Sequence, residues 1–197
     1  MSRYTRRRAL SSIAGASAAA LGLGLGVTGS AAAAPPEASV SFPDQTRGRG
    51  AGGAKVRVEE ATLDDGGFIV IHNDLLFETD PDDSKKENFR KVVDSISGVS
   101  DYLTPGRSKN VIISLRPDHV EDGEQTLIAM AHRDTNKNAE YDFEDQFPPA
   151  ADLPYWKDPD NPGPGFAGGS GAVVDQATVR LVGGNGNGNG NGNGKGR

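Results

Sequence analysis

The residues whose types and spacing best suit chemistry lie in one acidic run, DTNKNAEYDFED. Its oxygen-bearing side chains recur at alternate positions and again at the twelfth place: Asp134, Asn136, Asn138, Glu140, Asp142 and Asp145. A hard cation such as Ca²⁺ binds about six to eight oxygen atoms, and side chains at alternate positions of a tight loop can surround one point. The spacing resembles a calcium loop of the D-x-[DN]-x-[DN]-G-x₅-E type, so it predicts these six residues as metal ligands and Ca²⁺ as their cofactor.

The run departs from that pattern in two ways. Ala139 replaces the glycine that makes the sharp turn, and Asp145 is shorter than the glutamate that normally chelates through both oxygens. No pair of flanking helices is indicated, which argues against an EF-hand. The alternative is an Asn/Asp-rich turn whose side chains cap their own backbone, and both interpretations stay open.

Two of the three histidines, His72 and His132, each end a predicted strand. His132 precedes Asp134 by two residues, so converging strand ends would create a His/His/Asp transition-metal site. That arrangement would suit a small secreted metal-dependent hydrolase. The alternative is a pair of structural, hydrogen-bonded histidines. The third, His119, lies in an acidic loop and is expected to face solvent.

No other catalytic motif is complete. The chain has no cysteine, which excludes disulfides, thiolate metal sites and a cysteine nucleophile. The run Gly168–Ala172 (GGSGA) lacks the last glycine of G-x-S-x-G and precedes a predicted strand rather than a helix. We therefore predict no catalytic residue and no enzyme activity.

The elements that must position these residues are short strands separated by turns. Alternation and β-branched residues predict strands at Ala38–Phe42, Lys55–Glu60, Phe68–His72, Asn110–Leu115, Gln125–His132 and Ala172–Val182. One short helix is expected at Asp83–Val93, and a further strand at Val92–Ile96. The pattern favours an all-β fold, an immunoglobulin-like antiparallel β-sandwich.

Two segments are predicted to be surface loops, Glu78–Lys86 and Phe147–Ser170. The second is rich in proline and glycine and contains the only tryptophan, Trp156. A loop of this length is either functional or unstructured. Its Tyr155–Trp156 pair is either a binding platform or a clamp that packs the loop onto the sandwich.

The two ends of the chain have different compositions. Residues 1–34 combine basic residues, an apolar stretch and a small-residue cleavage site, which indicates a signal peptide, and Thr5–Leu10 (TRRRAL) resembles a twin-arginine export motif. A linker (35–37), the sandwich domain (38–182) and a disordered Gly/Asn tail (183–197) are expected to follow. The sequence thus predicts a secreted protein with no membrane span after cleavage.

The charge limits the partners. Residues 1–34 hold four arginines and no acid, so the rest has 17 basic groups against 27 acidic ones, a formal charge of −10. Such a surface repels nucleic acid and anionic membranes, which excludes them as expected partners. It suits a chain that stays hydrated in concentrated salt.

Five runs together resemble a domain of unknown function found in secreted and surface-associated proteins of halophilic archaea. They are GFIVIH (67–72), GVSDYLTPG (98–106), QTLIAM (125–130), HRDTNKNAEYDF (132–143) and GAVVD (171–175). The resemblance implies a β-sandwich outside the cell and implies no activity. We expect a non-catalytic extracellular or cell-surface module with a binding or structural role, stabilised by a cation, whose partner is unknown.

Overall fold

The computed structural model describes residues 37–50, 52–80, 82–145, 147, 151–158 and 171–183. The predicted signal peptide lies outside the described residues, as do nearly all of the predicted linker and tail and much of the Phe147–Ser170 loop. No helix among the described residues is long and apolar enough to cross a membrane.

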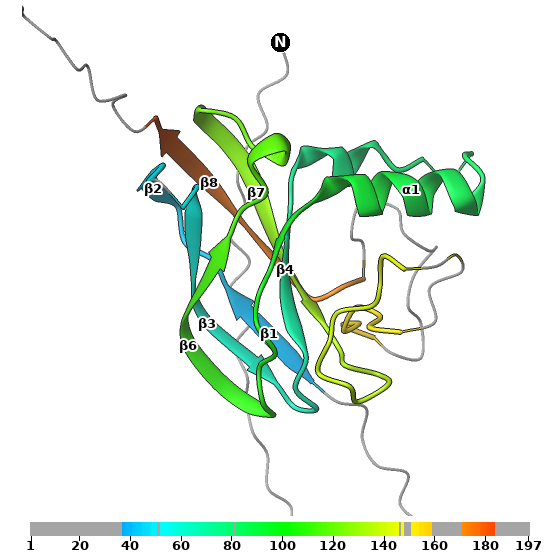
Figure 1. The fold of residues 1–197 in the computed structure, drawn as a ribbon. Coiled ribbons are helices and arrows are strands. Elements are labelled where there is room, and N and C mark those ends of the chain that lie inside the picture. Colours follow the sequence, from blue (N-terminus) through cyan, green and yellow to red (C-terminus); the bar gives the residue numbers. More distant parts are fainter. Residues whose placement is uncertain are drawn as a thin grey trace, which may run out of the picture. The chain divides into compact units, whose positions relative to one another are not determined.

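Two β-sheets form the sandwich (Figure 1). The smaller sheet has the order β1 (Ala38–Ser41), β3 (Lys55–Leu63) and β6 (Gly106–Ser114). The larger has the order β2 (Gln45–Gly48), β8 (Val174–Val182), β7 (Gly123–His132), β4 (Phe68–His72) and β5 (Ile96–Val99). All pairings are antiparallel except β2 with β8, which is parallel. The predicted all-β sandwich is confirmed.

The main core lies between the two sheets. Alternate residues of a strand point to opposite faces, and β3 accordingly buries Val56, Val58, Ala61 and Leu63. Ile69 and Ile71 of β4 meet them from the larger sheet and belong to the same buried cluster. Burial of this apolar area, at about 25 cal/mol per Å², is the main force that holds the sheets together.

A second core covers the outer face of the larger sheet. Phe68 and Val70 of β4 and Ile128 and Met130 of β7 point to this face, where α1 (Lys85–Ser95) packs through Phe89 and Val92. Two 3₁₀ turns, η1 (Asp74–Glu78) and η2 (Pro117–His119), complete the helical elements. Because β4 is covered on both faces, all five of its residues are buried.

Helix α1 follows from its sequence. Ser84 is the N-cap: its hydroxyl accepts from the Glu87 amide, and the Glu87 carboxylate accepts from the Ser84 amide, which makes a capping box. The predicted helix at Asp83–Val93 is confirmed, whereas the further strand predicted at Val92–Ile96 is wrong. The helix continues to Ser95, because Val92 faces the second core at helical spacing from Phe89, and β5 begins only at Ile96.

Candidate functional site

The six predicted cation ligands lie on the loop that follows β7. Asp134 is buried at its start, and its carboxylate oxygens accept hydrogen bonds from the backbone N–H of Asn138 at 3.2 Å and of Ala139 at 2.9 Å. Ala139 has a left-handed backbone (φ 59°), the conformation for which the calcium pattern uses glycine. The loop therefore closes tightly despite the alanine.

Three of the six ligands meet at one point. The amide nitrogens of Asn136 and Asn138 both donate to Oδ2 of Asp142, at 2.7 and 2.6 Å. Glu140 and Asp145 are exposed, and Asp134 is occupied by the backbone. Asn138 also accepts from the Glu140 amide at 2.8 Å, a bond typical of an Asn/Asp-rich turn. The loop thus has features of both interpretations, and its binding of Ca²⁺ stays a prediction.

Sequence reasoning missed Asp152, which anchors this loop. Its side chain is fully buried and accepts from the backbone N–H of Thr135 at 3.2 Å and of Asp142 at 2.6 Å. Its own N–H donates to the Thr135 hydroxyl at 2.9 Å. Burial raises the pKa of the Asp152 carboxyl. Nothing in the sequence marks this residue, because an aspartate in a Pro-rich segment is unremarkable there.

His72 and His132 come together, as the transition-metal prediction requires. Both are fully buried, and their ring centroids are 6.2 Å apart. Asp134 does not complete a site with them, since its oxygens bind the backbone of its own loop. Within the described residues there is no group of three or more His, Asp or Glu side chains that could hold a metal ion.

The hydrogen bonds of the two histidines define their tautomers. Nδ1 of His132 lies 2.6 Å from the carbonyl oxygen of Asp152 and must donate to it. Nδ1 of His72 lies 2.8 Å from the hydroxyl of Ser95, whose proton goes to the Val92 carbonyl, so this Nδ1 also donates. Burial lowers the pKa of His72 to about 3 and of His132 to about 4. Both rings are therefore neutral at neutral pH and carry a bare Nε2.

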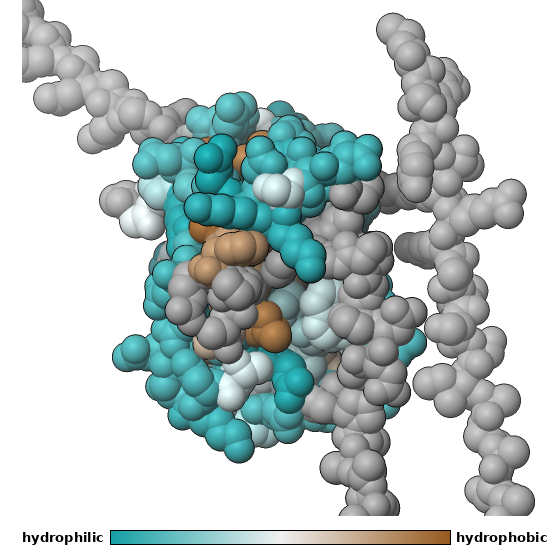
Figure 2. All heavy atoms as spheres, turned by 90° about the vertical axis from the view of Figure 1, so that its right-hand side faces the viewer, coloured by the Kyte–Doolittle hydropathy of each residue, from teal (hydrophilic) through white to brown (hydrophobic). Residues whose placement is uncertain are grey.

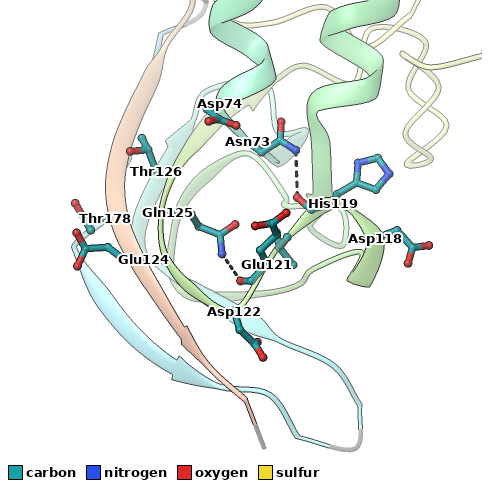
Figure 3. A pocket seen from close by; sticks show the side chains of 11 residues that line it. Asn73, Asp74, Asp118, His119, Glu121, Asp122, Glu124, Gln125, Thr126 and Thr178 are labelled. Atoms are coloured by element: carbon teal, nitrogen blue, oxygen red, sulfur yellow. Dashed lines mark hydrogen bonds between the residues drawn. The ribbon is translucent and has the colours of Figure 1, made fainter. Parts of the chain in front are cut away.

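A separate hollow opens at the ends of β7 and β8 (Figure 3). Its volume is about 590 Å³, and its walls are mainly polar. Five carboxylates line it: Asp74, Asp118, Glu121, Asp122 and Glu124. His119 also lines it and is partly exposed, in line with its expected place at the surface. The hollow attracts cations and repels anions, but its carboxylates surround it without converging on one point, as Figure 3 shows.

The Tyr155–Trp156 pair acts as a clamp in the structure. Tyr155 is buried, and its hydroxyl donates to the Gly66 carbonyl at 2.7 Å and accepts from the Asp65 amide at 3.1 Å. Trp156 packs against the second core.

Figure 2 shows that the face carrying α1 is mainly hydrophilic, with a small apolar area near its middle. Exposed Phe147 beside Phe89 and Val93 forms an apolar hollow on this helix.

These features define a small acidic β-sandwich module that carries a polar loop, a buried histidine pair and an acidic hollow. The chain belongs to the family of the domain of unknown function DUF7282, whose model matches residues 38–163. The match ends before β8, although β8 joins β2 to β7 in the larger sheet.

Two curated relatives from Haloarcula hispanica are similar to this chain. Cell surface glycoprotein 1 is 31% identical over 130 residues, and cell surface glycoprotein 2 is 34% identical over 129 residues. Each alignment covers 66% of this chain and 10% of the relative, so the chain spans about a tenth of the length of these relatives. No solved structure matches. The expected resemblance to surface-associated proteins of halophilic archaea is confirmed.

Proposed function

We propose that this chain is a non-catalytic module that acts outside the cell or at the cell surface, and that a divalent cation stabilises its Asp134–Asp145 loop. The similarity to two cell surface glycoproteins supports the location. The signal-like composition of residues 1–34 supports export. A partner at the surface is expected, and the strong negative charge makes nucleic acid an unsuitable one.

The observation that carries the cation proposal is the convergence of Asn136 and Asn138 on Oδ2 of Asp142. Each amide group turns its oxygen inward when it rotates by half a turn. Two amide oxygens and a carboxylate oxygen would then face one point, as a hard cation requires. Waters and the carboxylate of Glu140 or Asp145 would complete the shell. The cation would replace the two amide bonds to Asp142 and the bond from the Glu140 amide to Asn138, and would tie the loop more firmly to the sandwich.

The experiment is thermal unfolding of the full chain in molar KCl, first with EDTA and then with millimolar Ca²⁺. A ligand that binds only the folded state raises the midpoint by mass action. We expect a rise in the parent and in the control Asp82→Asn, which neutralises an exposed carboxylate on another loop. We expect no rise in Asp142→Asn, which keeps the side-chain shape and the backbone bond to Asp152. An unchanged parent, or an equal rise in Asp142→Asn, would refute the cation proposal.

The alternative of a metal-dependent hydrolase using His72 and His132 gains less support. The two rings do share one site, but neither has exposed surface. Hydrolysis needs water and substrate at the catalytic group. This pair is instead covered by α1, through Ser95, and by Tyr141 and Phe143 of the segment that follows β7. The burial of the pair therefore favours a role inside the fold.

A further inference from the structure

The buried histidine pair has coordinating capacity that the fold itself does not use. Nε2 of His72 and Nε2 of His132 are both buried and have no hydrogen-bond partner among the described residues. Buried nitrogen acceptors normally find a partner, because leaving a polar atom unpaired in an apolar core destabilises the fold. Two such atoms on neighbouring rings, with the likewise unpartnered hydroxyl of Tyr141 on a ring that packs against His132, indicate a shared ligand.

The two imidazole rings lie side by side on the outer face of the larger sheet, with centroids 6.2 Å apart and ring planes inclined by 23°. In the β4–β7 register Phe68 pairs with His132 and His72 with Ile128, so the histidines stand on the same face with one residue pair between them. Their Nδ1 atoms are held at opposite ends of this strand pair, by Ser95 and by the Asp152 carbonyl. Nε2 lies on the far side of each ring from Nδ1, so these anchors leave both Nε2 atoms unengaged.

The gap between the two rings fits a two-coordinate ion. With both Nε2 atoms turned toward each other, two metal–nitrogen bonds of about 2.0 Å and the part of each ring between its centre and Nε2 would span roughly the observed 6.2 Å. The nitrogen–metal–nitrogen angle would then be close to linear. A tetrahedral ion would need the rings closer together and two more ligands. Among the described residues, no Asp, Glu or further His completes such a group with the pair.

The surroundings favour a soft, singly charged ion over a divalent one. Met130, opposite Val70 in the register, stands on this face between the two histidines, and thioether sulfur suits Cu(I). The rings of Tyr141 and Phe143 pack edge-on against His132, with centroids 5.4 and 5.1 Å away. Burying charge in such a place is costly, and a monovalent ion carries the smaller cost.

The two rings are also held as metal-ligating histidines usually are. A ligating imidazole generally donates its other N–H to a carbonyl, carboxylate or similar acceptor, which fixes the tautomer and the ring orientation. His132 donates to a backbone carbonyl, and His72 to a hydroxyl that is itself bound to a carbonyl. Because burial lowers the pKa of both rings, protons do not compete for Nε2 at neutral pH.

We propose that His72 and His132 bind one Cu(I) ion between their Nε2 atoms, inside the second core. The site is distinct from the Asp134–Asp145 loop and differs from it in chemistry, since that loop offers only oxygen ligands. Cu(I) in this position ties β4 to β7 and stabilises the fold. The ion reaches the site either during folding or through transient opening of the covering segment.

The test uses the full chain and Cu(I) supplied anaerobically as a complex with a chromophoric chelator. Cu(I) is offered to the folded protein and, separately, during refolding, so that slow access does not hide binding. We expect the parent to withdraw one equivalent from the chelator and its thermal midpoint to rise by several degrees. The His119→Gln variant, which changes the partly exposed histidine at the acidic hollow, should behave like the parent. The His72→Gln and His132→Gln variants should withdraw none.

A second measurement needs only the parent protein and covers the case in which these variants do not fold. In ¹⁵N NMR of the histidine side chains, one equivalent of Cu(I) should shift the Nε2 signals of His72 and His132 and leave those of His119 unchanged. If the parent withdraws no Cu(I) either when folded or during refolding, the proposal is overturned. A bridging water would then be the shared ligand. Shifts confined to His119 would overturn it too. A change in the thermal midpoint on adding Ca²⁺ bears on the loop proposal and not on this one.

Discussion

At the residue scale, Asp152 determines how firmly the polar loop is held. Its carboxylate satisfies two backbone N–H groups, and its carbonyl orients His132. We expect Asp152→Ala to lower the free energy of unfolding by about 2–3 kcal/mol, because both N–H donors lose their acceptor. Urea unfolding measures this change. Asp118→Ala, which removes an exposed carboxylate, should have almost no effect, and an equally small loss in Asp152→Ala would contradict the anchoring role.

The buried histidines should make the fold sensitive to acid. An unfolded histidine has a pKa of about 6.5, whereas burial lowers the pKa of His72 to about 3 and of His132 to about 4. Above pH 6.5 both histidines are neutral in the folded and in the unfolded chain, so their contribution to stability is fully present. As pH falls toward 4 only the unfolded chain takes up these protons, so stability is lost.

Between pH 8 and pH 5 we expect a loss of about 3–4 kcal/mol, from about 1.36 kcal/mol per pKa unit on each histidine. Urea unfolding at several pH values between 8 and 5, with a chelator present to remove metal ions, measures this loss of stability. Asp152 acts in the opposite sense, because its raised pKa favours the protonated folded state. His119→Gln should keep the same slope. A parent slope near zero would contradict neutral, buried rings.

The chemistry of the candidate site was only partly predictable. Alternating oxygens marked the Asp134–Asp145 loop, because those residues are close in sequence. The meeting of His72 with His132 depends on the β4–β7 register, which the sequence does not specify at single-residue resolution. Asp152 was missed for the same reason, since its partners lie 10 to 17 residues away across an irregular segment.

At the scale of elements, the capping box of Ser84 and Glu87 fixes where α1 begins and thus how it covers the histidines. Ser84→Ala removes the hydroxyl that accepts from the Glu87 amide. We expect a loss of about 1 kcal/mol in thermal or urea unfolding, the usual effect of deleting such a cap. Lys86→Ala, on the exposed side of the same turn, is the control and should change stability little. Equal losses in both variants would mean that the cap contributes nothing.

The strands were predictable where one face is buried and the other is not, or where a strand is wholly apolar. Lys55–Glu60 alternates and lies within β3, and Phe68–His72 coincides with β4. Strand β2 was missed because Gln45–Gly48 contains no apolar residue and is held at the sheet edge by pairing with β8. The strand predicted at Val92–Ile96 was wrong because the apolar residues of this segment fit both a strand and the end of a helix.

At the scale of the whole molecule, negative charge works against compactness. The chain without residues 1–34 carries a formal charge of −10, and carboxylates crowd the hollow at the ends of β7 and β8. The screening length falls from about 10 Å at 0.1 M salt to about 3 Å at 1 M. Concentrated salt therefore weakens the repulsion between carboxylates more strongly in the folded chain, where they are closer, than in the unfolded one.

We therefore expect the thermal midpoint to rise between 0.1 and 1 M KCl and then to level off. A double variant Glu121→Gln/Glu124→Gln, which removes two exposed carboxylates from the hollow, should be more stable at low salt and respond less to KCl. The opposite variant Lys55→Gln/Lys86→Gln makes the chain more negative and should respond more. Sulfate also strengthens apolar burial. A thermal midpoint that does not change with KCl and rises only with sulfate would therefore contradict the charge explanation. The salt response would then belong to the two apolar cores.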